Sequence, residues 1–345
     1  MSGNRILIYT VLNYSGVIYT SLIILSIAGV NVFHTCPNLY GNDGCFMPMI
    51  YAIVILSEII ANLVLFHYYN SHNQVQYWTV KSSSLLPDAE AKRISQFDDV
   101  HGEDNERQRL LGGDRESPCT SRSTSGGRLV ITQDGIYQKE MWVPDDRPKG
   151  TTKFCYECRK LTPRRCHHCP LCEICVLRKD HHCMMTGGCV GLANQRYFIV
   201  FLLWAALGAA YGASFTFCYL DRFVAPWYPF GWIQYLAPVA LTNWILGHDS
   251  FLNFFFRHFV FCCCCIISCC CWLLWCSVHG YTYHDYHVGR LRDELESDGE
   301  NVNERLALVF GRRWWLNFLF PQVWNSNQLT PDIARNIFLS VSKDL

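Results

Sequence analysis

Residues 179–189 read KDHHCMMTGGC and place an acid, two histidines and two cysteines within eleven positions. Cysteine and histidine are common ligands of zinc, and a free cysteine beside a histidine can act as an activated nucleophile. The stretch could therefore bind a metal, attack an electrophile, or do both with different residues. Which of these applies depends on the other residues that compete for the same roles.

The residues before this stretch have zinc-binding spacing. A two-residue gap lets two cysteines bind one ion from a tight turn. The spacing selects eight residues, enough for two closed sites: Cys155, Cys158, His168, Cys169, Cys172, Cys175, His182 and Cys189. Spacing does not say which of them share an ion, and Cys183 remains outside the set. A polar segment of this size depends on metal binding for its folding free energy.

Long apolar segments flank this cysteine-rich block on both sides. They have 20 residues or more and at most one charged side chain each, and they run over 6–32, 45–66, 198–220 and 259–278. About 20 apolar residues in a helix cross the hydrocarbon core, and unbroken runs exclude the alternating strands of a barrel. We therefore predict an α-helical polytopic membrane protein, rather than buried helices of a soluble core. Its four transmembrane helices are expected at about 6–32, 45–67, 197–220 and 257–278.

The placement of charge predicts the orientation of these helices. Lysine and arginine are dense in 81–196 and in 290–313, whereas 31–44 has none. The positive-inside rule then places both termini and the cysteine-rich block in the cytoplasm. Cys36 and Cys45 face the other side, where a disulfide can persist. The alternative is that Cys45 simply begins the second helix.

The remaining segments follow from composition and from this orientation. The polar, charge-rich segment 69–152 buries too little apolar surface and predicts a largely disordered cytoplasmic linker. Parity of the crossings makes 221–256 luminal or re-entrant, although 231–247 could be a short span. The basic tail contains paired tryptophans that suit either a helix at the membrane interface or packing against the cysteine-rich block. The predicted units are a hairpin at 1–68, the linker, the cysteine-rich domain at 153–198, helices 3 and 4 within 197–278, and a cytoplasmic tail at 279–345.

The segment from Cys155 to Phe198 resembles the cysteine-rich domain of the DHHC protein S-acyltransferases, or palmitoyltransferases. The matching motifs are CYEC, PRRCHHCPLCEIC, DHHC at 180–183 and CVG at 189–191, followed by Asn194 and Phe198. The order of two helices, cytoplasmic block and two helices matches as well. The chain also resembles a divergent branch of the family that lacks the tryptophan after DHHC.

The resemblance implies how the residues of the block are divided. Two structural zinc ions are held by interleaved sets: Cys155, Cys158, His168 and Cys175 for the first, and Cys169, Cys172, His182 and Cys189 for the second. Three residues stay free for chemistry. Cys183 is the nucleophile that carries the palmitoyl intermediate, His181 is the general base, and Asp180 orients His181.

The implied activity is that of a protein-cysteine S-palmitoyltransferase. It takes a long-chain acyl group from the co-substrate acyl-CoA and passes it, in a ping-pong reaction, to membrane-associated substrate proteins. We expect an integral multi-pass protein in the membrane of the endoplasmic reticulum or Golgi. The alternative is a catalytically weak, zinc-stabilised membrane adaptor. We expect no nucleic-acid partner, because basic residues are interspersed with acidic ones.

This sequence departs from the common family pattern immediately after DHHC. Met184, Met185, Gly187 and Gly188 stand where many members have Pro, Trp and two Asn. Methionine offers a softer wall to an acyl chain, and glycines are expected to loosen the segment between nucleophile and ligand. Further on, Thr282-Tyr283-His284-Asp285 is the nearest match to the usual Thr-Thr-x-Glu.

Overall fold

The computed structural model describes residues 3–69, 152–155, 157–158, 160–163, 165–292, 297–323, 327–328, 330, 333–334 and 337. The predicted linker lies, apart from its first and last residue, outside the described residues, so its expected disorder stays a prediction.

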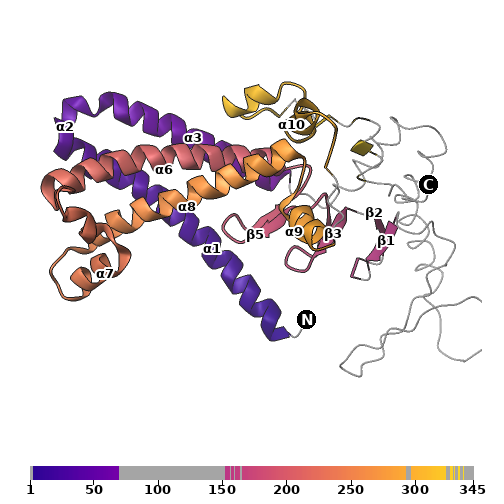
Figure 1. Cartoon of the computed structure of the whole chain (residues 1–345), viewed down its shortest axis with the longest axis horizontal. Helices are drawn as coiled ribbons and strands as arrows, with labels where there is room; N and C mark the ends of the chain where they lie inside the picture. Colours follow the sequence, from indigo (N-terminus) through magenta and orange to yellow (C-terminus); the bar gives the residue numbers. More distant parts are fainter. Residues whose placement is uncertain are drawn as a thin grey trace, which may run out of the picture.

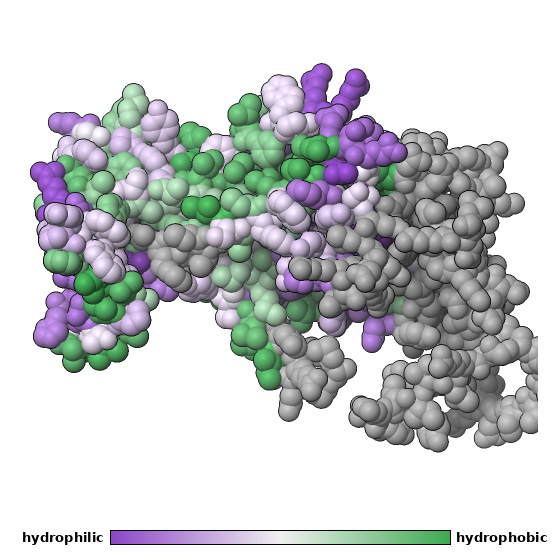
Figure 2. All heavy atoms as spheres, viewed as in Figure 1, coloured by the Kyte–Doolittle hydropathy of each residue, from purple (hydrophilic) through white to green (hydrophobic). Residues whose placement is uncertain are grey.

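Long apolar helices make up the larger part of the described structure, and the N-terminal one crosses the others obliquely (Figure 1). They are α1 Gly3–Val30, α3 Phe46–Tyr68, α6 Gln195–Phe223 and α8 Phe251–His279. Within the described residues, three helical stretches are long and apolar enough to cross a membrane: Thr10–Gly44, Phe46–Tyr68 and Gln195–Phe223. Figure 2 shows hydrophobic residues over these helices and hydrophilic ones toward their ends. The chain is therefore a helical membrane protein with several apolar helices and a cysteine-rich region.

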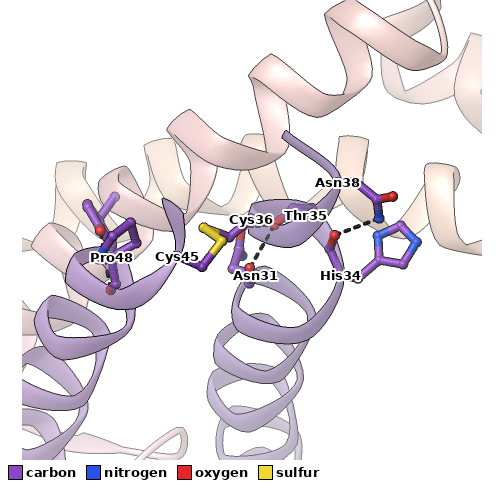
Figure 3. The surroundings of a disulfide bond; sticks show 8 residues. Asn31, His34, Thr35, Cys36, Asn38, Cys45 and Pro48 are labelled. Carbon is purple, nitrogen blue, oxygen red and sulfur yellow. Dashed lines mark hydrogen bonds between the residues drawn. A yellow bond between two sulfur atoms is a disulfide. The ribbon is translucent and has the colours of Figure 1, made fainter. Parts of the chain in front are cut away.

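The first helical hairpin is closed by a disulfide. Helix α1 continues through a π-helical turn, Asn31–Thr35, into the short helix α2, Cys36–Gly44. Cys36 and Cys45, at the two ends of α2, are joined by a disulfide, with their Cα atoms 5.9 Å apart (Figure 3). Of the two alternatives that the sequence left open, the structure has the disulfide. It lies at the end of the helices opposite to the strands of the cysteine-rich block (Figure 1).

The segment between α6 and α8 contains only short helices among its described residues. These are the 3₁₀ turn Gly231–Tyr235 and helix α7, Ala237–Ile245. Nine residues at 1.5 Å each give a helix of about 13 Å, less than half of the hydrocarbon thickness. Helix α7 lies at the same end of the structure as α2 (Figure 1).

Helix α8 begins six residues earlier than the sequence analysis placed it. Ser250 accepts a hydrogen bond from the backbone N–H of Asn253 at 3.2 Å and so caps the helix at Phe251. Arg257, at the predicted start, lies inside the helix, where it is buried and paired with Asp249. The predicted boundary followed the first charged residue, but this ion pair lets the helix continue past it.

The cysteine-rich block consists of three antiparallel hairpins among the described residues. Their strands are β1 Thr152–Cys155 with β2 Lys160–Pro163, β3 Cys166–Cys169 with β4 Ile174–Leu177, and β5 His181–Cys183 with β6 Gly188–Val190. An isolated two-stranded hairpin is marginally stable at best. Additional bonds must therefore hold these strands in place.

The tail packs against this block, which is one of the two alternatives expected for it. Its described elements are α9 Tyr283–Arg292, α10 Val302–Phe310 and the 3₁₀ turn Trp314–Phe318. Leu308 of α10 shares a buried cluster with Leu177 and Leu192 of the block. Asn327 adds amide hydrogen bonds to the carbonyl oxygens of Leu192 and Leu308, at 3.0 and 2.8 Å. Tail and block thus form one packed unit.

Candidate functional site

The structure brings the eight zinc-ligand candidates together as two groups of four. One group is Cys155, Cys158, His168 and Cys175, and the other is Cys169, Cys172, His182 and Cys189. Within each group the ligand atoms all lie within 4.8 Å of one another. Strand β3 supplies ligands to both groups, because His168 and Cys169 are neighbours on it. The membership is the same as that implied by the family resemblance.

The distances within the second group suit a tetrahedral zinc ion. His182 Nδ1 lies 3.5, 3.3 and 3.5 Å from the Sγ atoms of Cys169, Cys172 and Cys189. Ordinary zinc bond lengths in a tetrahedron require about 3.6 Å between nitrogen and sulfur. Cys172 and Cys189 Sγ are 3.6 Å apart, against about 3.8 Å for two sulfur ligands. Three sulfurs facing one imidazole nitrogen at these separations can hold a metal ion.

A third group of potential ligands, His167, His284 and Asp285, lies where α9 meets β3. The carboxylate of Asp285 is already paired with Arg165 and accepts a hydrogen bond from the Thr282 hydroxyl at 2.7 Å. Burial raises the pKa of Asp285, but the nearby Arg165 outweighs burial and holds that pKa well below its usual range. We therefore treat this group as a contact between tail and block.

Asp180, His181 and Cys183 remain outside both ligand groups. The Nδ1 atom of His181 lies 2.6 Å from Oδ2 of Asp180, whose side chain is 1% exposed. Asp180 also fixes its own backbone through an N–H bond to the carbonyl oxygen of Val190 at 2.9 Å. Because β5 carries His181, His182 and Cys183 in succession, His182 can enter the metal group while its two neighbours do not.

The electrostatics of this trio favour a charged sulfur and a charged imidazole. Burial alone lowers the pKa of His181, but hydrogen bonds with Asp180 and Cys183 outweigh it and raise the pKa to about 9. Burial raises the pKa of the Cys183 thiol, yet interactions with His181 and Thr186 outweigh it, and the net shift is downward. A thiolate is the reactive form of cysteine.

The tail supplies the second hydrogen bond to Asp180. The backbone N–H of Tyr283, in the first turn of α9, donates to Oδ1 of Asp180 at 2.7 Å. Thr282 caps this helix by accepting from the N–H of Asp285 at 3.0 Å. The free N–H groups and the dipole of a helix N-terminus stabilise an anion. The carboxylate of Asp180 thus has hydrogen-bond partners on both sides, His181 and the Tyr283 N–H.

Buried arginines fix the tail in this position. Asp298 is fully buried and pairs with Arg165 and with Arg178, whose Nη2 is 2.7 Å from Oδ2 of Asp298. Arg165 also pairs with Asp285 of α9. Two carboxylates from the tail therefore meet two arginines from the block, which keeps Tyr283 over Asp180.

An apolar cavity of about 770 Å³ extends from this trio along the helices. His181 and Cys183 line one end, and Cys36 and Cys45 line the end near α2. Its walls come from all four long helices, including Ile24, Ile55, Phe201 and Leu273. A narrow apolar space of this volume suits a flexible hydrocarbon chain.

Sequence reasoning missed the roles of Tyr283, Arg165, Arg178 and Asp298. The Thr-x-x-Asp spacing of 282–285 was a usable signal, because it is the pattern of a helix cap whose first N–H groups need acceptors. Asp298 lies in a charged run of the tail, and nothing in its local sequence distinguishes it from exposed neighbours.

Comparison with known proteins gives a consistent result. Residues 148–290 match the family model described as DHHC palmitoyltransferase. Palmitoyltransferase ZDHHC20-B of Danio rerio is 29% identical over 183 residues, which cover 48% of this chain and 49% of that protein. Palmitoyltransferase ZDHHC15 of Xenopus laevis is 28% identical over 171 residues, which cover 48% of this chain and 46% of the relative.

A shorter match has higher identity. Palmitoyltransferase ZDHHC15A of Danio rerio is 45% identical over 58 residues, covering 17% of this chain and 18% of the relative. The matches with these three proteins thus span between 18% and 49% of their lengths. With its two Cys3His groups and its DHHC trio, the segment 148–290 is similar to the DHHC palmitoyltransferase family.

Proposed function

We propose that the chain is a protein S-acyltransferase that moves a long-chain fatty acyl group from acyl-CoA, through Cys183, to cysteines of membrane-associated proteins. The observation that carries this proposal is the position of Cys183. It lies outside both ligand groups, interacts with His181, and lines an apolar cavity formed by the long helices. A purely structural zinc loop needs none of these features.

In the first step, the Cys183 thiolate attacks the carbonyl carbon of the acyl-CoA thioester. The proton of the thiol has passed to His181, whose charge Asp180 stabilises. The new carbon–sulfur bond forms, the bond to coenzyme A breaks, and His181 returns its proton to the departing CoA sulfur. The products are an acyl-enzyme and free coenzyme A.

In the second step, a cysteine thiol of the substrate protein gives its proton to His181 and attacks the acyl-enzyme. Cys183 leaves as a thiolate, and the acyl group is now a thioester on the substrate. One thioester replaces another in each step, so no external energy source is required. The cavity binds the chain, and each buried methylene contributes about 0.8 kcal/mol, which favours long chains over short ones.

The two ligand groups would hold structural zinc. The first set is Cys155, Cys158, His168 and Cys175, and the second is Cys169, Cys172, His182 and Cys189. Bound zinc would supply cross-links among hairpins that are too small to be stable alone. Because His182 is flanked by His181 and Cys183, the same cross-link would fix the backbone of the reacting residues.

We further propose four transmembrane spans, α1, α3, α6 and α8, with the block and both termini on the cytoplasmic side. The short helix α7 would stay on the opposite side together with α2. A disulfide at the α2 end and free cysteines at the other end support this orientation, because disulfides persist where the compartment is oxidising. The membranes of the endoplasmic reticulum or Golgi meet this requirement.

Labelling with a clickable long-chain fatty acyl-CoA tests the function. The purified protein should acquire a label that hydroxylamine removes, and Cys183→Ser should acquire none. The matched control is Cys218→Ser, since Cys218 is an exposed free cysteine of α6 that does not line the cavity. This control should label as the unmodified chain does. Equal labelling of Cys183→Ser would refute the assigned nucleophile, and absence of label on the unmodified chain would favour the adaptor function.

A further inference from the structure

Helix α1 contacts the DHHC loop through a polar group. Its Asn13 places Oδ1 3.0 Å from Nε2 of His182. Because Nδ1 of His182 faces the three cysteine sulfurs, the ring proton lies on Nε2. The Nε2–H group then donates a hydrogen bond to Oδ1 of Asn13. An asparagine on a helix that is proposed to span the membrane needs such a partner, since an unpaired amide in hydrocarbon is costly.

The same face of α1 lies unusually close to the turn between β5 and β6. A Cβ atom added to Gly16 would lie 2.5 Å from the carbonyl oxygen of Met184, which is a backbone atom that cannot swing aside. A Cβ added to Gly187 would lie 2.7 Å from Cγ2 of Val17. Gly187 also has φ = +71°, a conformation that glycine adopts without strain.

Asn13, Gly16 and Val17 are spaced i, i+3 and i+4, and they therefore share one face of the helix. Their partners belong to one hairpin, with His182 on β5 and Met184 and Gly187 in the turn between β5 and β6. Gly16 and Gly187 each remove a side chain from this interface. Gly187, which was expected to loosen the loop, also lets α1 approach it.

We infer that Asn13, Gly16 and Val17 form a docking face that positions the DHHC loop, with Asn13 as the outer partner that orients His182 toward its metal group. Helix α1 then links the lipid-embedded hairpin directly to the ligand beside the nucleophile. Outer hydrogen-bond partners of metal-bound histidines typically affect metal affinity or activity 10- to 100-fold. The inference does not depend on acyl transfer, because metal retention reports on it without any acyl donor.

The first test compares Asn13→Leu with Asn13→Asp in full-length, detergent-purified protein loaded with zinc. Transfer of zinc to a coloured chelator is followed over time. Asn13→Leu removes the acceptor and should release about one of two zinc ions roughly 10- to 100-fold faster than the unmodified chain. Asn13→Asp keeps an acceptor oxygen and should retain zinc for much longer than Asn13→Leu. Equal release from Asn13→Leu and the unmodified chain would overturn the role of Asn13.

The second test uses a pair of glycines on the same helix. Gly16→Ala should speed zinc release, because its methyl group pushes the Met184 carbonyl away. Gly29→Ala is the matched control, since a Cβ there has no neighbour within 4 Å, and it should behave as the unmodified chain does. Indistinguishable release from the two alanine variants would overturn the docking face.

Two further measurements separate a local effect from unfolding and from the proposed chemistry. The Cys36–Cys45 disulfide, measured by alkylation, reports whether the hairpin has folded in each variant. Hydroxylamine-sensitive labelling should fall together with zinc retention in Asn13→Leu and Gly16→Ala. If the unmodified chain does not label, the proposed activity fails while the zinc comparison still tests the docking face.

Discussion

Replacing Asp180 with asparagine should slow acylation of Cys183 by about 10- to 160-fold at neutral pH. Asp180 accepts two hydrogen bonds, from His181 at 2.6 Å and from the Tyr283 N–H at 2.7 Å. An asparagine has one acceptor oxygen, so its NH₂ group must face one of these two donors. The lost charge-assisted bond contributes about 1.5–3 kcal/mol, and each 1.36 kcal/mol corresponds to a factor of ten in rate.

The pH dependence of the variant follows from the same contact. Asp180 is a main cause of the raised pKa of His181, and the charged His181 in turn lowers the pKa of Cys183. Without the carboxylate, the pKa of His181 falls and that of Cys183 rises, so fewer molecules hold the thiolate at neutral pH. At higher pH the thiol ionises without help from His181, and the deficit of the variant should therefore shrink.

The assay is single-turnover labelling by a clickable acyl-CoA between about pH 6 and pH 9, quenched at set times and checked with hydroxylamine. Zinc content serves as the control for folding, because Asp180 belongs to neither ligand group. A rate equal to that of the unmodified chain across this range would refute the role of Asp180. So would a reduced rate with an unchanged dependence on pH.

Three other substitutions test separate parts of the structure. Asp298→Ala leaves the buried Arg178 without a counter-charge and leaves Arg165 with Asp285 alone. It should cost about 3–5 kcal/mol, seen as a lower unfolding temperature, whereas Ala at the exposed Glu300 should change that temperature little. Thr186→Val removes a buried hydroxyl that helps to lower the pKa of Cys183, so the rate of acylation at neutral pH should fall. Thr186→Ser keeps a hydroxyl and should have most of the original rate. Equal rates for the unmodified chain and both variants would assign Thr186 to packing alone. The double variant Cys36→Ser, Cys45→Ser lacks a cross-link that contributes about 2–3 kcal/mol to stability. In the unmodified chain, reduction should increase the number of alkylated cysteines by two. The double variant should show no such increase.

Local spacing was sufficient to predict the set of candidate metal ligands, whereas their division into two groups came from the family resemblance. Cysteine pairs two residues apart and the ligands around them all lie between 155 and 189, so short hairpins bring them together with little help from the remainder of the chain. The long helices were equally readable, because an unbroken apolar run of 20 residues leaves few alternatives in a bilayer. Boundaries were less accurate, as the early start of α8 at its Ser250 cap shows.

The effect of Gly187 could not be predicted from composition. Glycine permits flexibility, and the sequence alone therefore suggested a loosened loop. In the folded chain Val17 fills the space that a side chain at 187 would occupy, and the glycine makes a tight contact. The expected loosening of the loop stays a prediction.

The sequence by itself predicted the candidate metal ligands and several apolar helices. Only the tertiary structure decided what surrounds the nucleophile. Tyr283 is 103 positions from Asp180, and Asn13 is 169 positions from His182. The physical reason is that ligand spacing is limited by the reach of a few residues, whereas these contacts depend on how whole helices and the tail pack. Such packing results from many weak contacts, and no short motif records it.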